Sequence, residues 1–160
     1  MTRKIINLTD RPWTFRTDPS NDGLAQGWQR EPQPSDEWKP IRVGQHWEGQ
    51  GYESLDGWAW YRIEMELPDD WKDTELFLWI DGGDDYYEVF ANGQKVGSAG
   101  NIEDKKTAFE IQSSFKLTSV SSGSKLAIAI RVYDWQGAGG MFRPIALSTT
   151  DRDSSLEILK

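Results

Sequence analysis

The chain has 160 residues and no cysteine, which allows one domain with a sizeable core and excludes both a disulfide framework and a thiolate metal site. Its formal net charge of −8 argues against nucleic acid as a partner, because phosphate binding draws on clustered Lys and Arg. No apolar run approaches the roughly 18 residues that a membrane span needs, so no membrane partner is expected. The start of the chain lacks the apolar core of a secretory signal, which leaves a cytoplasmic protein or an excised or mature domain.

Aromatic residues are frequent, with nine tryptophans, five tyrosines and six phenylalanines. Large rings dominate protein cores, so burial is the commoner role for any single one of them. Tryptophan also forms flat platforms on which the apolar faces of sugars stack. The composition alone is compatible with both core packing and sugar stacking.

Strand patterns follow one another along the whole chain. Alternating apolar residues and turn signals predict strands in these ranges: 3–16 (two short pieces), 41–43, 58–67, 76–80, 86–91, 94–96, 108–117, 126–133 and 141–147. Residues 17–40 are rich in Pro and Gly and form an irregular loop, which we expect Trp28 and Trp38 to pin to the body of the domain. No helical period is sustained anywhere.

Short strands at intervals of about 8 to 12 residues predict an all-β antiparallel sandwich. An eight-stranded jelly roll is its natural closed form. The hairpin at Asn92-Gly93 supplies two residues that tolerate φ > 0, as a type I′ turn requires. No linker divides the chain, so we take residues 1–160 as a single domain.

Counting strand directions from this hairpin sorts the loops onto the two ends of the sandwich. If successive strands alternate in direction, one end carries the loops 44–57, 81–85, 97–107 and 134–140, and the other carries 68–74, 92–93 and 118–124. We call the first set the loop end. Its loops are longer and richer in Gly and aromatic residues. Because binding residues tend to lie on loops held by a rigid scaffold, a ligand is expected there.

The motifs in this order resemble the N-terminal sugar-binding domain of glycoside hydrolase family 2. The segments that carry the resemblance are Trp13-x-Phe15-Arg16, Gly27-Trp28, Trp38, Ile41-x-Val43, Trp47, Gly51-Tyr52, Trp60-Tyr61-Arg62, Asp81-Gly82, Val89-Phe90-Ala91-Asn92-Gly93, Val96-Gly97 and Gly139-Gly140-Met141-Phe142-Arg143-Pro144. Each motif is weak alone, but together they keep the family's order and spacing. They cover roughly residues 7–148 and leave 149–160 as a C-terminal tail.

The resemblance implies a galactose-binding-domain-like jelly roll without catalytic residues. In complete enzymes similar to β-galactosidase and β-glucuronidase, this domain packs beside an immunoglobulin-like domain and a catalytic barrel that holds two glutamates. This chain carries no barrel, so the expected partners are a mono- or oligosaccharide and other domains of a glycosidase. In some family members the loop that corresponds to residues 47–58 reaches into the sugar pocket, although its contacts cannot be matched residue by residue.

Sugar recognition needs stacking faces together with planar hydrogen-bonding groups. The loop end offers eight candidates: Trp47, Gln50, Tyr52, Glu53, Trp58, Trp135, Gln136 and Arg143. Two alternatives stay open, since Trp47 and Trp58 can instead fold inward to cover the sandwich, and Arg143 can pair with a carboxylate.

Asp81, Asp84 and Asp85 are weak candidates for a structural calcium ion, which favours carboxylate and carbonyl oxygens from a turn. Their spacing is not that of an EF-hand, and Asp and Gly are ordinary turn residues. The matching family segment is a structural part of the hairpin. We therefore expect no cofactor, with calcium as the alternative.

Three functions follow. The first is a non-catalytic carbohydrate-binding or accessory domain. The second is a structural module with no ligand of its own, which would expose an apolar face around Phe77, Trp79 and Phe90. The third is a small hydrolase, which the sequence supports poorly because His46 has no evident nucleophile beside it.

Overall fold

The computed structural model describes residues 3–30, 37–71, 74–117 and 125–152. Within these ranges the chain forms ten strands: β1 (Ile5–Asn7), β2 (Trp13–Thr17), β3 (Lys39–Ile41), β4 (Gly57–Glu66), β5 (Phe77–Ile80), β6 (Tyr86–Ala91), β7 (Gln94–Ala99), β8 (Ser113–Lys116), β9 (Lys125–Asp134) and β10 (Ile145–Ser148). Two single turns of 3₁₀ helix, η1 (Trp47–Gln50) and η2 (Asp69–Trp71), are the only helical elements of the described residues. None of these described helices is long and apolar enough to cross a membrane.

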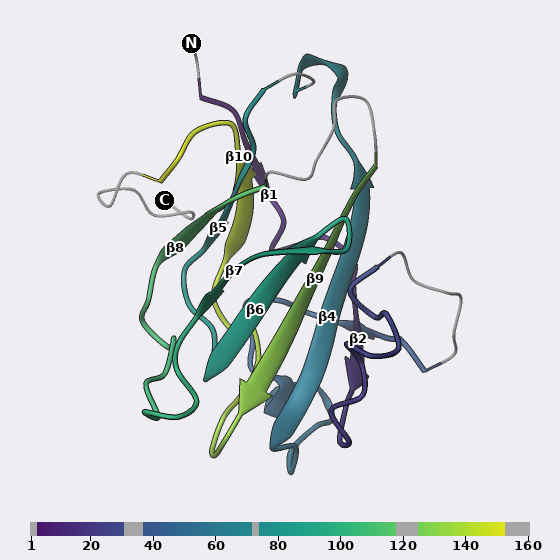
Figure 1. Ribbon diagram of the computed structural model, residues 1–160, viewed down its shortest axis with the longest axis vertical. Coiled ribbons are helices and arrows are strands. Elements are labelled where there is room, and N and C mark those ends of the chain that lie inside the picture. Colours follow the sequence, from purple (N-terminus) through teal and green to yellow (C-terminus); the bar gives the residue numbers. More distant parts are fainter. Residues whose placement is uncertain (1–2, 31–36, 72–73, 118–124, 153–160) are drawn as a thin grey trace.

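The strands form two antiparallel sheets that pack face to face (Figure 1). The first sheet has the order β1-β10-β5-β8, and the second has the order β3-β2-β4-β9-β6-β7. The predicted all-β jelly-roll sandwich is confirmed. Its described residues form ten strands rather than eight, because the short strands β1 and β3 each add to one edge of a sheet.

Strand positions agree with the predicted ranges where the pattern alternates without interruption, and β6 spans 86–91 as predicted. The predicted strands 108–117 and 141–147 are shorter than expected. At the start of the first, the Ala108 N–H donates to the carbonyl of Asp85 and Ile111 closes a turn onto Ala108. At the start of the second, the Met141 N–H donates to the Tyr61 hydroxyl. The first backbone group thus bonds to a loop and the second to a side chain of β4, so neither pairs with the backbone of a neighbouring strand.

The hairpin between β6 and β7 has the predicted turn. Asn92 and Gly93 have φ values of 47° and 88°, both in the left-handed region that a type I′ turn uses. The Asn92 side-chain oxygen also accepts a bond of 2.8 Å from the Ala127 N–H, which ties the hairpin to β9.

The core lies between the sheets and is built from the inward positions of their central strands. β4 and β9 pair along their whole length, from Gly57 opposite Asp134 to Glu66 opposite Lys125. The inward side chains are fully or almost fully buried: Tyr61, Ile63, Leu78, Ile80, Leu126, Ile128, Ile130, Val132, Ile145 and Leu147. Period-two patterning placed these residues on one face of each strand.

The loop after β2 covers the outer face of the larger sheet. Trp28 packs edge-on against Trp38 and Trp60, with ring centroids 5.6 and 6.1 Å apart. With Phe90 and Ala129 these rings form a small second apolar cluster. The prediction that Trp28 and Trp38 pin this loop is therefore confirmed.

Polar contacts hold the same loop. Arg131 is buried, lies 3.6 Å above the Trp58 ring and donates to Asn21 in the loop and to Glu88 at 2.9 Å. Burial opposes the charge of Glu88, but hydrogen bonds from Tyr86 and Arg131 outweigh it and lower the pKa of Glu88 below its usual value. The outer face thus has its own buried polar network.

Candidate functional site

The four loops of the predicted loop end do meet at one end of the sandwich, the lower end in Figure 1. Trp47 N–H donates to the Gly139 carbonyl at 3.0 Å, and Gly44 N–H to the Met141 carbonyl at 2.9 Å. Asp84 and Gly140 exchange two backbone bonds, of 3.1 and 3.0 Å. The predicted arrangement of these loops is confirmed.

Two of the eight predicted sugar-contacting residues serve the fold itself. Trp47 is fully buried, packs edge-on against Phe15 and donates its indole N–H to the Leu55 carbonyl at 3.2 Å. The alternative in which this ring folds inward is thus the observed one. Gln50 accepts from the Arg42 N–H at 2.7 Å and donates to the Arg42 carbonyl at 2.9 Å. Its carboxamide thereby pairs with the backbone as a neighbouring strand would.

The next two candidates are half-buried rings. Tyr52 packs against Phe15, with centroids 4.7 Å apart. The Trp58 ring centroid lies 4.8 Å from that of Tyr133, its partner in the β4–β9 ladder, and Tyr86 and Arg131 also pack against this ring. The Trp58 ring is therefore held in place and only partly open to solvent.

The remaining four candidates lie farther out. Glu53 and Gln136 are exposed, and Trp135 is half-buried with the Lys105 ammonium 5.6 Å from its ring centroid. The Arg143 guanidinium lies over Phe109 and Phe142, at 5.5 and 5.1 Å from their ring centroids. Trp58 and Trp135 are neighbours in register, since Trp135 follows two residues after the ladder partner of Trp58. Sugar contact by these residues stays a prediction.

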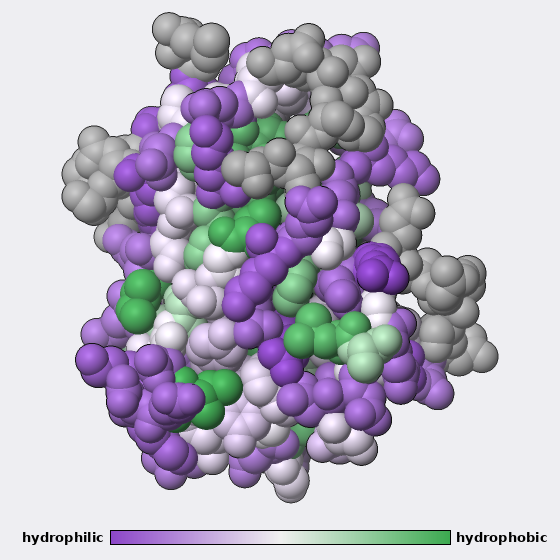
Figure 2. All heavy atoms as spheres, in the orientation of Figure 1, coloured by the Kyte–Doolittle hydropathy of each residue, from purple (hydrophilic) through white to green (hydrophobic). Residues whose placement is uncertain are grey.

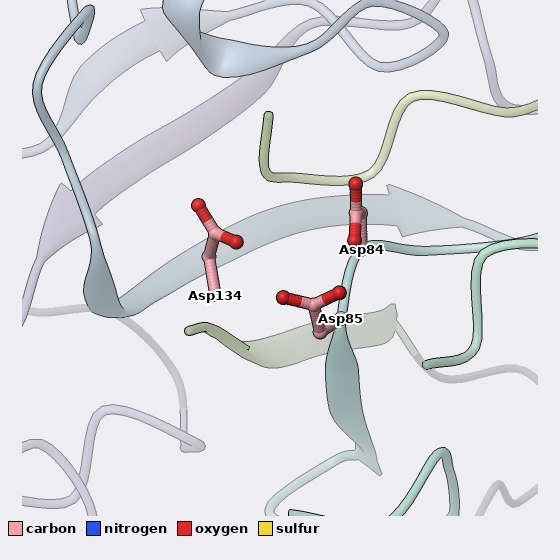
Figure 3. A group of neighbouring side chains, drawn as sticks. All are labelled: Asp84, Asp85 and Asp134. Carbon is pink, nitrogen blue, oxygen red and sulfur yellow. The ribbon is translucent and has the colours of Figure 1, made fainter. Parts of the chain in front are cut away.

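A cluster of three carboxylates lies inside the loop end. Asp84 and Asp85 precede β6, Asp134 ends β9, and Figure 3 shows their side chains gathered at one point. One oxygen from each residue lies within 4.8 Å of the other two. The residues are 9%, 5% and 0% exposed. The peptide bond between Asp84 and Asp85 is cis.

This acidic cluster differs in one member from the predicted calcium candidates. Asp81 lies apart from it and forms an ion pair with Arg152, 71 positions later in the chain. Asp134 takes its place. The sequence did hold a signal for this residue, because Asp134 continues the inward-facing alternation of Ile130 and Val132 along β9. A carboxylate at an inward position calls for a partner.

Few donors reach the cluster. Asp85 accepts from the Trp135 N–H at 3.0 Å, and Thr107 donates to Asp84 at 3.4 Å. The His46 ring nitrogen Nε2 lies 4.0 Å from an oxygen of Asp84. Neither carboxylate oxygen of Asp134 receives a hydrogen bond from the residues that the structure describes.

The three carboxyl groups divide into one acid that stays charged and two that hold protons. Burial, and then the neighbouring Asp85, raise the pKa of Asp84 to about 8 and that of Asp134 to about 9. For Asp85, burial also acts against the charge, but hydrogen bonds from Asp84, Asp134 and the Trp135 N–H lower its pKa. The cluster is closed to a substrate, so it can hold protons or a hard cation but offers no general acid to an external bond.

Comparisons with known proteins identify what the chain is similar to. No model of a known protein family matches it. It is 25% identical over 173 aligned positions to a β-galactosidase of Priestia megaterium, an alignment that covers 86% of this chain and 16% of that enzyme. The structure superposes on Ruminococcus gnavus β-glucuronidase in complex with N1-substituted uronic isofagomine, with a TM-score of 0.78 and 16% identity over 92% of this chain and 30% of the other. Ruminococcus gnavus β-glucuronidase by itself gives a TM-score of 0.77, with 91% and 28% covered.

The chain thus corresponds to one part of these glycosidases, since it spans less than a third of each. The similar sequence and the similar structure both belong to glycosidases. The chain is thus similar in sequence to part of a β-galactosidase and has the fold of part of a β-glucuronidase, which agrees with the resemblance to glycoside hydrolase family 2 that its motifs indicate.

Proposed function

We propose that the chain is a non-catalytic carbohydrate-binding accessory domain that acts within a larger glycosidase. The observation that carries this proposal is the extent of the match: 92% of this chain superposes on 30% of a β-glucuronidase chain. Proteins that share a fold can differ in function, so the support for sugar binding comes from the residues of the loop end.

The outer surface of the loop end suits a sugar better than its interior does. Trp58 and Trp135 each keep part of a ring open to solvent, and Gln136 adds an exposed carboxamide beside them. Apolar ring faces and planar hydrogen-bonding groups are what a pyranose requires. We assign the stacking role to Trp135, because it precedes a Gly-rich turn that leaves space around the ring.

A role as a structural module without a ligand is the alternative. The rings expected to form its docking face are buried, with Phe77 at 8%, Trp79 at 0% and Phe90 at 5% exposure. The face seen in Figure 2 is largely polar, with hydrophobic residues in small separate groups. Such scattered groups need no partner to explain them, which favours the carbohydrate-binding proposal.

Calorimetric titration with a panel that includes galactose, glucuronic acid and their oligosaccharides tests the proposal. We expect measurable heat with at least one sugar, together with a change in tryptophan fluorescence. Trp135→Ala should weaken that binding about tenfold, since loss of an aromatic anchor costs on the order of 1–2 kcal/mol. Leu24→Ala, which removes an exposed apolar side chain from the loop after β2, is the matched control and should bind normally.

The absence of heat and of fluorescence change with every sugar would refute carbohydrate binding. Turnover of aryl-glycoside or ester substrates above background would instead support the small hydrolase. We expect none, because the three loop-end carboxylates that cluster together, Asp84, Asp85 and Asp134, are buried.

A further inference from the structure

Asp134 is a buried carboxyl group that accepts no hydrogen bond from the described residues. Its residue is 0% exposed, and neither side-chain oxygen has a hydrogen-bond donor there. No Lys or Arg of the described part of the chain forms an ion pair with Asp84, Asp85 or Asp134. Burying a carboxylate without a partner costs several kcal/mol, and either protons or a cation between these oxygens removes that cost.

A fourth carboxylate, that of Glu48, contacts the Gly-rich loop beside the cluster. Glu48 has one oxygen that accepts from the Gly139 N–H at 2.9 Å and a second, buried oxygen with no donor. Gly139 lies directly against Asp134, since a Cβ added to this glycine would lie 2.6 Å from a carboxylate oxygen of Asp134. Gly139 therefore contacts both Glu48 and Asp134.

We propose that Asp84, Asp85 and Asp134 form a binding site for one Ca²⁺ ion in the interior of the loop end. Oxygens within 4.8 Å of one another can all contact a single Ca²⁺, because two ligands on opposite sides of the ion at about 2.4 Å are separated by that distance. Mg²⁺ demands a near-ideal octahedron at about 2.0–2.1 Å and usually keeps several waters, which a buried cluster of carboxylates suits less well than Ca²⁺. The donor set is all oxygen and carries excess negative charge, which selects a hard cation.

The chain completes the site from two separate strands. Asp84 and Asp85 lead into β6, while Asp134 lies at the far end of β9, so a bound ion would cross-link the loop 81–85 to the loop 134–140. This role is structural and does not depend on the proposed sugar binding.

Thermal unfolding of the whole chain, after chelator treatment and with Ca²⁺ added back, tests the site. At a hundredfold excess of Ca²⁺ over its Kd, the Tm should rise by about 5 to 10 °C for a chain of this length. An equal rise with Mg²⁺ would overturn the assignment to calcium. No rise with Ca²⁺ and no heat in a calorimetric titration would overturn the site altogether.

Two conservative variants locate the ion. Asp134→Asn keeps the shape of the side chain, removes its charge and should abolish the Ca²⁺-dependent rise. Asp56→Asn removes one charge from an exposed carboxylate at the same end and should keep the rise. Loss in both variants would mean that Ca²⁺ responds only to the negative surface, and retention in both would refute the site.

Terbium luminescence supplies a readout that does not depend on stability. Tb³⁺ occupies calcium sites and emits when a nearby tryptophan is excited, and Trp135 follows directly after Asp134. The native chain should give an emission that Ca²⁺ displaces. If Asp134→Asn fails to fold, Asp84→Asn replaces it in this assay, and undiminished Tb³⁺ emission from a folded variant would contradict the proposal.

Discussion

Asp18 offers the sharpest test of how the loop after β2 is attached. Its carboxylate is 2% exposed and accepts three hydrogen bonds: from the Asp22 N–H at 2.8 Å, and from the Gly23 N–H and the Trp60 indole N–H at 3.0 Å each. One side chain therefore joins the loop to the central strand β4. Asp18→Ala should release the loop from the outer face of the sheet.

The expected cost follows from what happens to each donor. A hydrogen bond to a charged group contributes about 1.5–3 kcal/mol, but donors that reach water recover most of this. The N–H groups of Asp22 and Gly23 can hydrate once the loop loosens, whereas the Trp60 indole N–H stays buried beneath Trp28. We therefore expect a loss of about 3 kcal/mol in the free energy of unfolding, equivalent to a drop in Tm of about 6–12 °C.

Urea unfolding followed by tryptophan fluorescence measures this loss. Asp18→Asn retains one acceptor oxygen and should lose about half as much stability. Asp22→Ala removes an exposed carboxylate next to the same donors and should change stability by less than about 0.5 kcal/mol. A loss below about 1 kcal/mol for Asp18→Ala, or one equal to that of Asp22→Ala, would refute the anchoring role.

Other variants probe the core and the outer network. Tyr61→Phe removes the hydroxyl that accepts the buried Met141 N–H at 3.1 Å and should cost about 1–3 kcal/mol in urea unfolding, whereas an unchanged midpoint would contradict this. Gly97→Ala would place a methyl 2.3 Å from the Phe115 ring and should cost about 1–3 kcal/mol, so an equally stable variant would show that the ring moves freely. The pKa of Glu88 is lowered from 4.5 on folding, so its contribution is present above pH 4.5 and is lost as the pH falls through the folded value. Stability should therefore decrease less on acidification in Glu88→Gln than in the native chain, and equal slopes of urea midpoint against pH would contradict the assignment.

The sheet was predictable because its signals are local. Period-two alternation located β6 at 86–91, and the positive φ values of Asn92 and Gly93 follow from residue types that tolerate them. Alternating the direction of successive strands gave the direction of each strand. The same count predicted that the four loops meet at one end.

The interior of the loop end was not predictable, because its pairings span large sequence separations. Asp81 pairs with Arg152, and Asp84 lies close to Asp134. The sequence of the turn that contains Asp81 and Asp84 does not indicate either partner. The register between β6 and β9 determines which aspartates meet. Tyr86 lies opposite Tyr133, and this pairing brings Asp85 beside Asp134.

The orientation of loop side chains was equally hidden. Trp47 begins a 3₁₀ turn, to which neither the strand nor the helix period applies. Its burial depends on Gly139, because a Cβ there would lie 2.5 Å from the Trp47 ring. A loop nearly a hundred residues away therefore decides whether this tryptophan faces a ligand or the core.

The proposed calcium site and the proposed sugar site use adjacent residues, Asp134 and Trp135. Asp134 ends β9 with its side chain directed inward, and Trp135 follows with its ring partly outside, as alternation along an extended segment requires. Calcium would bind on the inner side of the loop and a sugar on the outer side. Trp135→Ala should then weaken sugar binding and leave the Ca²⁺-dependent rise in Tm unchanged, whereas removing Ca²⁺ should affect sugar binding only through the position of the loop. If calcium and sugar instead competed for the protein, the sugar would have to reach the carboxylates, and the inward direction of Asp134 would be wrong.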